Sequence, residues 1–199
     1  MGSVVLLSGG IDSTTCAAIE AASGRLDACI FIDYGQPARK QEQAAAETWC
    51  AGHGVRLFAS ALPLEIGAMG APAGEVGPRI VPGRNLALAA LAVSVAISID
   101  SKAVVLGATG GDSDTYPDCR LPFIRALSSL CRKTYGVQLE APLAHRSKRA
   151  VVAIARAEGV DLSATWSCYT PDDSGAPCRT CNACKERSAV LPALVEGLG

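Results

Sequence analysis

The 199-residue chain has few aromatic residues (5%) and few charged residues (19%), and its formal net charge is only -1. Without a basic surplus, the composition gives no support to non-specific nucleic-acid binding. No apolar run reaches the ~20 residues that cross a bilayer. The most apolar stretch, residues 86–99, is better explained as a buried helix. The opening residues leave no room for a signal peptide before a glycine-containing turn, so we expect a cytoplasmic protein.

Hydrophobic residues make up 49% of the chain. Since aromatic residues are scarce, most of these hydrophobic residues are aliphatic. This composition suits a packed helix–sheet protein better than a β-sandwich. Apolar runs predict strands at residues 3–7, 28–32, 55–59, 103–106 and 137–139. The segments between them predict helices at residues 12–22, 38–51, 85–99, 121–135 and 147–158, with Asn85 and Ser147 as N-caps.

The alternation of strands and helices predicts an α/β fold with a doubly wound, mainly parallel, Rossmann-like sheet in residues 1–160. Residues 161–199 are expected to form a small C-terminal segment packed on that domain. In such folds ligands bind beyond the carboxyl ends of the strands. Three loops follow predicted strands, at residues 8–10, 63–83 and 107–118, and we expect them to converge on one crevice.

The first of these loops begins the sequence Ser8-Gly9-Gly10-Ile11-Asp12-Ser13-Thr14-Thr15. Paired glycines let the backbone approach an anion closely, and the following helix offers N–H groups with a partial positive charge. The lysine of a Walker A loop and the Gly-x-Gly-x-x-Gly fingerprint are both absent here. The octet instead resembles the pyrophosphate loop, Ser-Gly-Gly-x-Asp-Ser, of the N-type ATP pyrophosphatases. That resemblance implies cleavage of ATP between its α- and β-phosphates. Asp12 is either a magnesium ligand or the N-cap of the helix, and we favour the cap.

Four of the nine cysteines crowd the C-terminal region, namely Cys168, Cys178, Cys181 and Cys184. Tetrahedral zinc takes four such ligands, and two-residue spacers let successive cysteines face one ion. The cluster therefore predicts a structural zinc site. Disulfides conflict with a reducing compartment. An iron–sulfur cluster stays an alternative, because Cys-x2-Cys-x2-Cys occurs in ferredoxins.

Four further segments resemble hallmarks of the 7-cyano-7-deazaguanine synthase family (QueC). They are Asp33-Tyr34-Gly35-Gln36, Val81-Pro82-Gly83-Arg84-Asn85, Tyr116-Pro117-Asp118-Cys119-Arg120 and Thr165-Trp166-Ser167-Cys168-Tyr169. The matches follow the family's order from Leu6 to Arg187. The resemblance implies an adenine nucleotide alpha hydrolase-like fold. It also implies a reaction in which ATP adenylylates the carboxylate of 7-carboxy-7-deazaguanine and ammonia displaces AMP. A second ATP then activates the amide oxygen, whose loss leaves a nitrile.

The resemblance also implies roles for individual residues. A carboxylate must approach a polyanionic nucleotide, so cations and backbone donors are needed, with magnesium on the phosphates. The candidate catalytic cations are Arg84, Arg120 and Lys148. We expect ATP to contact Leu6, Leu7, Ser8, Gly9, Gly10, Asp12, Ser13, Thr14, Asp33, Tyr34, Gly35, Gln36 and Gly107. We expect the deazaguanine to contact Arg84, Asn85, Asp112, Tyr116, Asp118 and Arg120.

The sequence departs from the family pattern in loops that are expected to face the crevice. Leu121-Pro122-Phe123 stand where the family usually carries x-Glu-Phe, and Gly110-Gly111-Asp112 stand where a Glu precedes Thr-Asp. Pro37-Ala38 replace Arg-His, and Arg179 replaces a common Gly among the cysteines. A buried amidine edge needs an acidic acceptor, so the loss of two glutamates bears on substrate specificity.

Three alternatives to nitrile synthesis therefore stay open. A related ligase would join the activated acid to a different amine or protein acceptor and stop at the amide. A PP-loop RNA thiolase would adenylylate a base, although the near-zero net charge argues against it. A non-catalytic module would bind ATP without releasing pyrophosphate. On the main interpretation the partners are ATP, a deazaguanine carboxylate and ammonia, without membrane or nucleic acid, and the family resemblance implies a homodimer.

Overall fold

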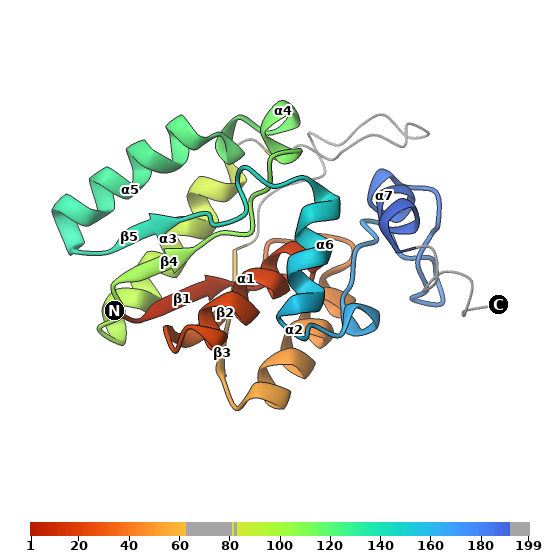
Figure 1. Cartoon of the computed structure of the whole chain (residues 1–199), viewed down its shortest axis with the longest axis horizontal. Helices are drawn as coiled ribbons and strands as arrows, with labels where there is room; N and C mark the ends of the chain where they lie inside the picture. Colours follow the sequence, from red (N-terminus) through yellow and green to blue (C-terminus); the bar gives the residue numbers. More distant parts are fainter. Residues whose placement is uncertain (63–80, 82, 192–199) are drawn as a thin grey trace.

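The computed structural model describes residues 1–62, 81 and 83–191, and its centre is a parallel sheet (Figure 1). Five strands are ordered β3-β2-β1-β4-β5, and every neighbouring pair is parallel. The doubly wound, mainly parallel sheet expected from the sequence is confirmed. The strands are β1 (Ser3–Leu6), β2 (Leu26–Asp33), β3 (Arg56–Ala61), β4 (Ala103–Val105) and β5 (Gln138–Glu140).

Helices cover both faces of this sheet (Figure 1). One face packs against α1 (Ile11–Ala22), α2 (Arg39–His53) and α6 (Lys148–Ala157), and the other against α3 (Arg84–Ser98) and α5 (Leu121–Tyr135). The remaining elements are the short helix α4 (Asp112–Thr115), the 3-10 turns η2 (Pro117–Cys119) and η3 (Leu162–Ala164), and α7 (Asn182–Val190). Figure 1 shows α7 beside α6, at one side of the sheet.

The alternation of side chains in β1 explains this layering. Val4 and Val5 are both fully buried, but Val4 packs with the α3 and α5 layer and Val5 with the α1 and α6 layer. Parallel strands are normally buried on both faces, and their sequences are accordingly apolar throughout. In α1 the small side chains of Cys16 and Ala17 are fully buried and let the helix approach the sheet. The carboxyl ends of the central strands are thereby fixed relative to α1.

The caps expected from the sequence are only partly right. Ser147 accepts a hydrogen bond from the Ala150 N–H (3.4 Å), so it caps α6 as predicted. The prediction that Asp12 caps α1 is wrong, because Gly10 is the N-cap and Asp12 lies inside the first turn. Asn85 does not cap α3 either, because that helix starts one residue earlier, after Gly83 at a φ of 71°. A glycine at positive φ ends the preceding loop without strain, and the Asn85 N–H in the first turn of α3 instead donates to Asp118 Oδ2 (2.9 Å).

Two loop predictions also change. Residues 107–118 are not an extended loop, because they contain α4 and most of η2. The predicted loop at residues 63–83 lies outside the described residues except at Val81 and Gly83. The sequence did not predict α7, whose polar positions mask its helical periodicity. Among the described residues, no helix has both the length and the apolar character needed to cross a bilayer.

Candidate functional site

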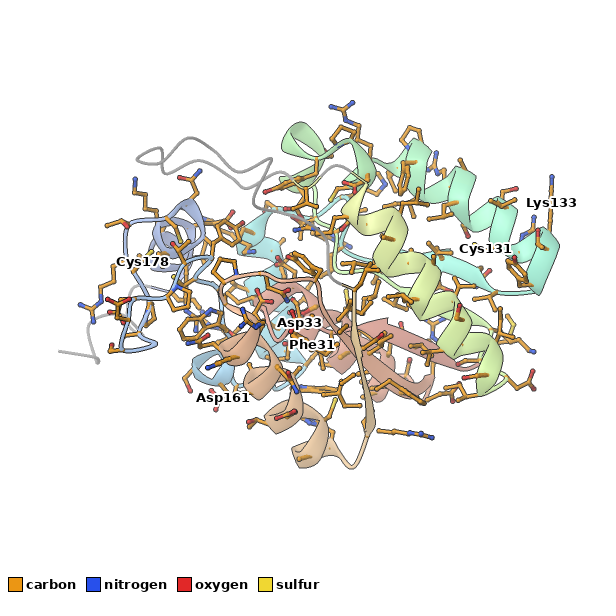
Figure 2. All side chains as sticks on the ribbon, turned by 180° about the vertical axis from the view of Figure 1, so that it is seen from behind. Phe31, Asp33, Cys131, Lys133, Asp161 and Cys178 are labelled. Carbon is orange, nitrogen blue, oxygen red and sulfur yellow. The ribbon has the colours of Figure 1, made fainter. Side chains whose placement is uncertain are left out.

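A cavity of about 300 Å³ opens at the carboxyl ends of β1, β2 and β4. Ligands of doubly wound sheets bind at this edge, where neighbouring strands connect in opposite directions. Figure 2 shows Phe31 and Asp33 near the end of β2 in the middle of the molecule. The volume is at the lower end of the range for small-molecule pockets. The glycine loop forms one wall of the cavity, through Ser8, Gly10, Asp12 and Ser13.

The glycine loop is held open by its own hydroxyl groups. The Ser8 N–H donates to Ser13 Oγ (3.1 Å), and the Ser13 hydroxyl donates to the Gly10 carbonyl (3.2 Å). Gly9 adopts a φ of +72°, and a Cβ there would lie 2.6 Å from the backbone oxygen of Glu42 in α2. Only glycine therefore fits at this position. The first N–H groups of α1 follow directly, and a helix start of this kind favours a bound anion.

An ion pair lies beneath the loop. The Lys148 ammonium donates to both carboxylate oxygens of Asp12, at 3.0 and 2.7 Å, and also lies 3.4 Å from Glu186 of α7. Burial alone would lower the pKa of Lys148, but the Asp12 carboxylate outweighs it and the pKa is raised. Burial also raises the pKa of Asp12, and the attraction of Lys148 does not fully offset it. Keeping Asp12 ionised therefore costs free energy, and the ion pair with Lys148 reduces that cost.

Among the described residues of the cavity wall there is one arginine, Arg84. The Arg84 guanidinium lies 5.7 Å from the ring centre of Tyr34 and 5.6 Å from that of Tyr116. It also donates to the Tyr34 hydroxyl (3.4 Å). Two ring faces on one guanidinium fix its direction by cation–π attraction while leaving its charge available to a ligand. Burial disfavours the charged form, yet nearby tyrosine oxygens raise the pKa of Arg84, so it stays a cation.

The residue after Arg84 joins α3 to η2. The Asn85 N–H donates to Asp118 Oδ2 (2.9 Å), and the Asn85 side-chain amide donates to Cys119 Sγ (3.1 Å). Burial raises the pKa of Cys119 to about 11. Its thiol is therefore neutral at physiological pH, which agrees with a packing role and not with a nucleophile. These bonds fix the motif containing Asp118 against the start of α3.

The four C-terminal cysteines form a metal-binding cluster. Their sulfur atoms all lie within 4.8 Å of one another. Sulfur atoms that share one ion must be this close, whereas the thiolates of an iron–sulfur cluster bind separate irons and stand farther apart. The Cys178 N–H donates to Cys168 Sγ (3.2 Å), and the Cys181 N–H to Cys178 Sγ (3.4 Å). Such bonds stabilise the negative charge of thiolate ligands. Figure 2 shows Cys178 in a segment at one end of the molecule.

The family model described as Queuosine biosynthesis protein QueC matches residues 2–194. The chain belongs to the QueC family. Among curated relatives, the 7-cyano-7-deazaguanine synthase of Prochlorococcus marinus (strain MIT 9303) is 34% identical over 94% of this chain and 91% of its own length. The enzyme of that name from Alcanivorax borkumensis is 36% identical over 93% of this chain and 91% of its own length.

Solved structures share the fold of this QueC chain at low identity. The U34-tRNA thiolase NcsA from Methanococcus maripaludis, solved with its [4Fe-4S] cluster, has a TM-score of 0.56 and 15% identity. That comparison covers 99% of this chain and 67% of the thiolase. The NMN synthetase from Francisella tularensis has a TM-score of 0.55 and 14% identity, over 95% and 76% of the two chains. At such identities the likeness concerns the fold alone.

Most residues predicted from the QueC motifs line the one cavity. Of the residues expected to contact ATP, those that line the cavity are Leu6, Leu7, Ser8, Gly10, Asp12, Ser13, Tyr34, Gln36 and Gly107. Of the residues expected to contact the deazaguanine, those that line the cavity are Arg84, Asn85, Asp112, Tyr116 and Asp118. As far as the structure describes the wall, it leaves out Gly9, Thr14, Asp33, Gly35, Arg120 and Lys148. The structure places Arg120 at the surface, where its Nε donates to the Ser113 carbonyl (3.0 Å), and Lys148 behind the loop.

Among the lining residues that the sequence analysis missed, two carry a hydroxyl or carboxylate group, Tyr169 and Glu42. Tyr169 lines the cavity and comes from the segment that contains Cys168, Cys178, Cys181 and Cys184, called the cysteine segment below. It belongs to a QueC motif, so the sequence contained a signal for it. Glu42 is on α2, and its Oε2 accepts a hydrogen bond from the buried Gln36 amide (2.9 Å). Burial raises the pKa of Glu42. Nothing in the polar sequence of α2 distinguishes Glu42 from its solvent-exposed neighbours.

The two departures from the QueC pattern that replace glutamates lie away from the cavity wall that the structure describes. Pro122 is exposed at the start of α5, and Gly110 is packed close to the Arg146 carbonyl. A Cβ at Gly110 would lie 3.2 Å from that oxygen, so a larger residue would require a shift. The cavity keeps four other carboxylates, those of Asp12, Glu42, Asp112 and Asp118.

Proposed function

We propose that this chain is an ATP-dependent 7-cyano-7-deazaguanine synthase. The observation that carries the proposal is a cavity at the strand ends whose wall contains both the anion-binding glycine loop and Arg84. Relatives that match over more than 90% of both chains are named 7-cyano-7-deazaguanine synthase. A nucleotide triphosphate and a carboxylate are the two anions that such a cavity suits.

In the first half-reaction, the carboxylate of 7-carboxy-7-deazaguanine attacks the α-phosphorus of ATP. The acyl adenylate forms and pyrophosphate leaves, and ammonia then displaces AMP to give the amide. The N–H groups at the start of α1 and the Ser8 and Ser13 hydroxyls would bind the phosphates. Arg84 would orient the carboxylate and stabilise the charge that builds up during transfer. The two tyrosine rings keep that guanidinium in place before the substrate arrives.

In the second half-reaction, the amide oxygen attacks the α-phosphorus of a second ATP and pyrophosphate leaves. The nitrogen then loses both of its protons while the carbon–oxygen bond breaks, so that the amide oxygen departs with AMP and the carbon–nitrogen triple bond is complete. Both steps are attacks by a substrate oxygen on the α-phosphorus of an ATP molecule, so one site suffices for both. The thiol of Cys119 is neutral at physiological pH because burial raises its pKa, and this argues against a thioester route.

Charge in the cavity explains why magnesium would enter with ATP. In the part of the wall that the structure describes, four carboxylates accompany one cation, Arg84. A triphosphate would add further negative charge, which magnesium neutralises when it is bound to the phosphates. Asp12 and Asp112, which lie near each other, are the carboxylates available to that ion. Asp112 and Asp118 also provide an acidic acceptor for the amidine edge of the base, so the replaced glutamates are not required for it.

For the cysteine cluster we propose zinc in a structural role. Zinc–sulfur bonds of about 2.3 Å place tetrahedral sulfurs about 3.8 Å apart, within the span of the cluster. All four positions are filled by protein, so zinc there would hold the segment and not take part in the reaction. Elemental analysis of protein purified without added metal tests this assignment. One zinc per chain is expected, and iron with acid-labile sulfide would contradict it.

Mass spectrometry of products tests the proposed reaction directly. Metal-loaded protein is mixed with ATP, magnesium, 7-carboxy-7-deazaguanine and ¹⁵N-ammonium. The expected products are a ¹⁵N-labelled nitrile, AMP and pyrophosphate, with two AMP formed per nitrile. An amide that accumulates without conversion would refute nitrile synthesis in favour of the amide-forming ligase. ATP binding without pyrophosphate release would indicate a non-catalytic module.

A further inference from the structure

The segment before the cysteine cluster runs directly along the glycine loop. The Trp166 backbone N–H donates to the Gly9 carbonyl (2.9 Å). On the next residue of the loop, a Cβ at Gly10 would lie 3.4 Å from the Trp166 carbonyl oxygen. The backbone of Trp166 therefore bounds both glycines from outside the cavity. Glycine loses more conformational freedom on ordering than any other residue, so contacts of this kind help the Gly9–Gly10 turn to keep one shape.

The same tryptophan is fixed to the cysteine cluster through its side chain. The Trp166 indole N–H donates to the Cys168 carbonyl (2.8 Å), and its ring packs against the buried cysteines. In addition, Arg187 of α7 donates to Thr165 Oγ1 (2.9 Å) and to Ser167 Oγ (3.1 Å). Residues on both sides of Trp166 are thus held by the helix that begins directly after Cys181.

A second connection joins α7 to the other end of the loop. Lys148 donates to Asp12, and its ammonium also lies 3.4 Å from Glu186, which follows Cys184 closely in α7. Figure 1 shows α6 and α7 next to each other. Gly9 and Asp12, near the two ends of the loop, are therefore both connected to the segment that carries the cysteines.

Val190 and Leu191 at the end of α7 pack in the main core, but the part of the chain around the cysteines has only a small apolar cluster of its own. Its cluster consists of Cys168, Cys181 and Cys184, packed with Trp166, Cys178 and Ala183. So small an apolar cluster cannot offset the entropy of ordering the chain, and in comparable sites metal binding supplies the folding free energy. The shape of the glycine loop then depends on whether the cysteines hold their metal.

We infer that Trp166 is a positioning residue, through which the metal-loaded cysteine segment holds the Gly9–Gly10 turn in its anion-binding shape. Metal and ATP then bind with positive coupling, although the two sites share no ligand. The inference depends on ATP binding at the glycine loop but not on the acceptor that ATP activates. Linkage requires the coupling to be reciprocal, so that each ligand increases the affinity for the other by the same factor.

The test measures this reciprocity with α,β-methylene-ATP, which resists cleavage between its α- and β-phosphates. A chromogenic chelator competes for zinc in the presence and absence of the saturating analogue. We expect the analogue to raise the zinc affinity roughly tenfold, within the usual range of coupling between two sites. Titration calorimetry of zinc-loaded and chelator-treated protein should give the same factor for the analogue. A zinc affinity that is unchanged by a bound analogue would overturn the inference.

Two tryptophan variants assign the effect to Trp166. Trp166→Phe keeps a ring on the cysteines but removes the indole N–H bond to the Cys168 carbonyl. It should still bind one zinc per chain, while the coupling factor falls severalfold toward one. The matched control is Trp49→Phe, because the Trp49 ring packs in the main core and its indole N–H has no partner among the described residues. A coupling factor in Trp166→Phe that equals the wild-type factor would contradict the positioning role of Trp166.

These measurements remain informative if the zinc-free protein unfolds. The chelator competition starts from loaded protein, and circular dichroism shows whether the chain stays folded as zinc leaves. Zinc affinity that rises with the analogue in the wild type and not in Trp166→Phe supports the inference in either case. Neither measurement uses a deazaguanine, so a failure of nitrile synthesis and a failure of the coupling are separate results.

Discussion

Lys148 offers the sharpest test of how the site is built, because its ammonium is the partner of a buried carboxylate. Replacing it by methionine keeps the length of the side chain and removes the charge. The Asp12 carboxylate, 2.7 Å away in the wild type, is then left without its ion-pair partner beneath the glycine loop. We expect the Lys148→Met variant to be destabilised and to bind ATP weakly, since the uncompensated Asp12 charge repels the phosphates.

The size of the effect follows from the geometry of the pair. At about 3 Å and an effective dielectric constant of 20, the attraction has an upper bound of about 5 kcal/mol. Removing one member of a buried pair typically costs about 3–5 kcal/mol. Both side chains are about one fifth exposed, at 21% and 22%, and water can partly solvate the remaining carboxylate. We therefore expect a loss of about 2–3 kcal/mol, or ~5–10 °C in Tm for a chain of this length.

A double-mutant cycle separates the charge from the packing. Asp12→Asn, Lys148→Met and the double variant are compared by urea unfolding at pH 8, with the exposed Arg149→Met as control. The folded pKa of Lys148 lies above its ordinary value of 10.5, so its contribution is fully present below that pH and is lost only as the pH rises through the folded pKa. The double variant should recover most of the stability, because two neutral groups need no partner. Lys148→Met as stable as the control would refute the reasoning.

Three further predictions concern the loop and the cavity. Gly9→Ala should lose at least ~1–2 kcal/mol of stability through its positive φ alone, with a clash against Glu42 added, and should bind α,β-methylene-ATP weakly in calorimetry. The control is Gly52→Ala, because no atom lies within 4 Å of the new Cβ there, and its stability should increase by about 0.5–1 kcal/mol. Similar losses of stability in both variants would contradict the steric account. Arg84→Lys keeps the charge but loses the fixed planar group between two rings, so kcat/KM should fall roughly tenfold, and an unchanged value would show that charge alone is sufficient. Cys119, with a pKa of about 11, is only about 0.1% thiolate at pH 8. Peptide mass spectrometry after iodoacetamide treatment should therefore find Cys119 unlabelled at pH 8 and increasingly labelled as the pH approaches 11. Rapid labelling at pH 8 would contradict the neutral thiol.

The sheet and the position of the glycine loop could be predicted from the sequence because both depend on local patterns. Apolar runs define the strands, and the loop directly follows the first of them. The cap at Asp12 was mispredicted because its true partner, Lys148, is far away in the sequence and no local rule connects the two. Glu42 was missed for a similar reason. It looks like a surface residue of a polar helix until the fold places that helix against the glycine loop.

The replaced glutamates show the limit of reading motifs without a structure. At the level of the sequence, Gly110 and Pro122 suggested a changed substrate pocket, because both lie in motifs attributed to that pocket. The fold places Pro122 at the exposed start of a helix and Gly110 against a backbone oxygen. A motif shows which segments approach the site, but the direction of each side chain depends on local backbone geometry.

The bond between Gly9 and Trp166 also has a consequence for protein synthesis. The glycine loop is translated well before Trp166 and the four C-terminal cysteines. All five strands are complete before any of these late residues has been translated. Contacts of such long sequence separation form late in folding. A nascent chain can therefore complete its sheet while its nucleotide loop still lacks its outer contact, so the capacity to bind ATP is acquired after the sheet is in place.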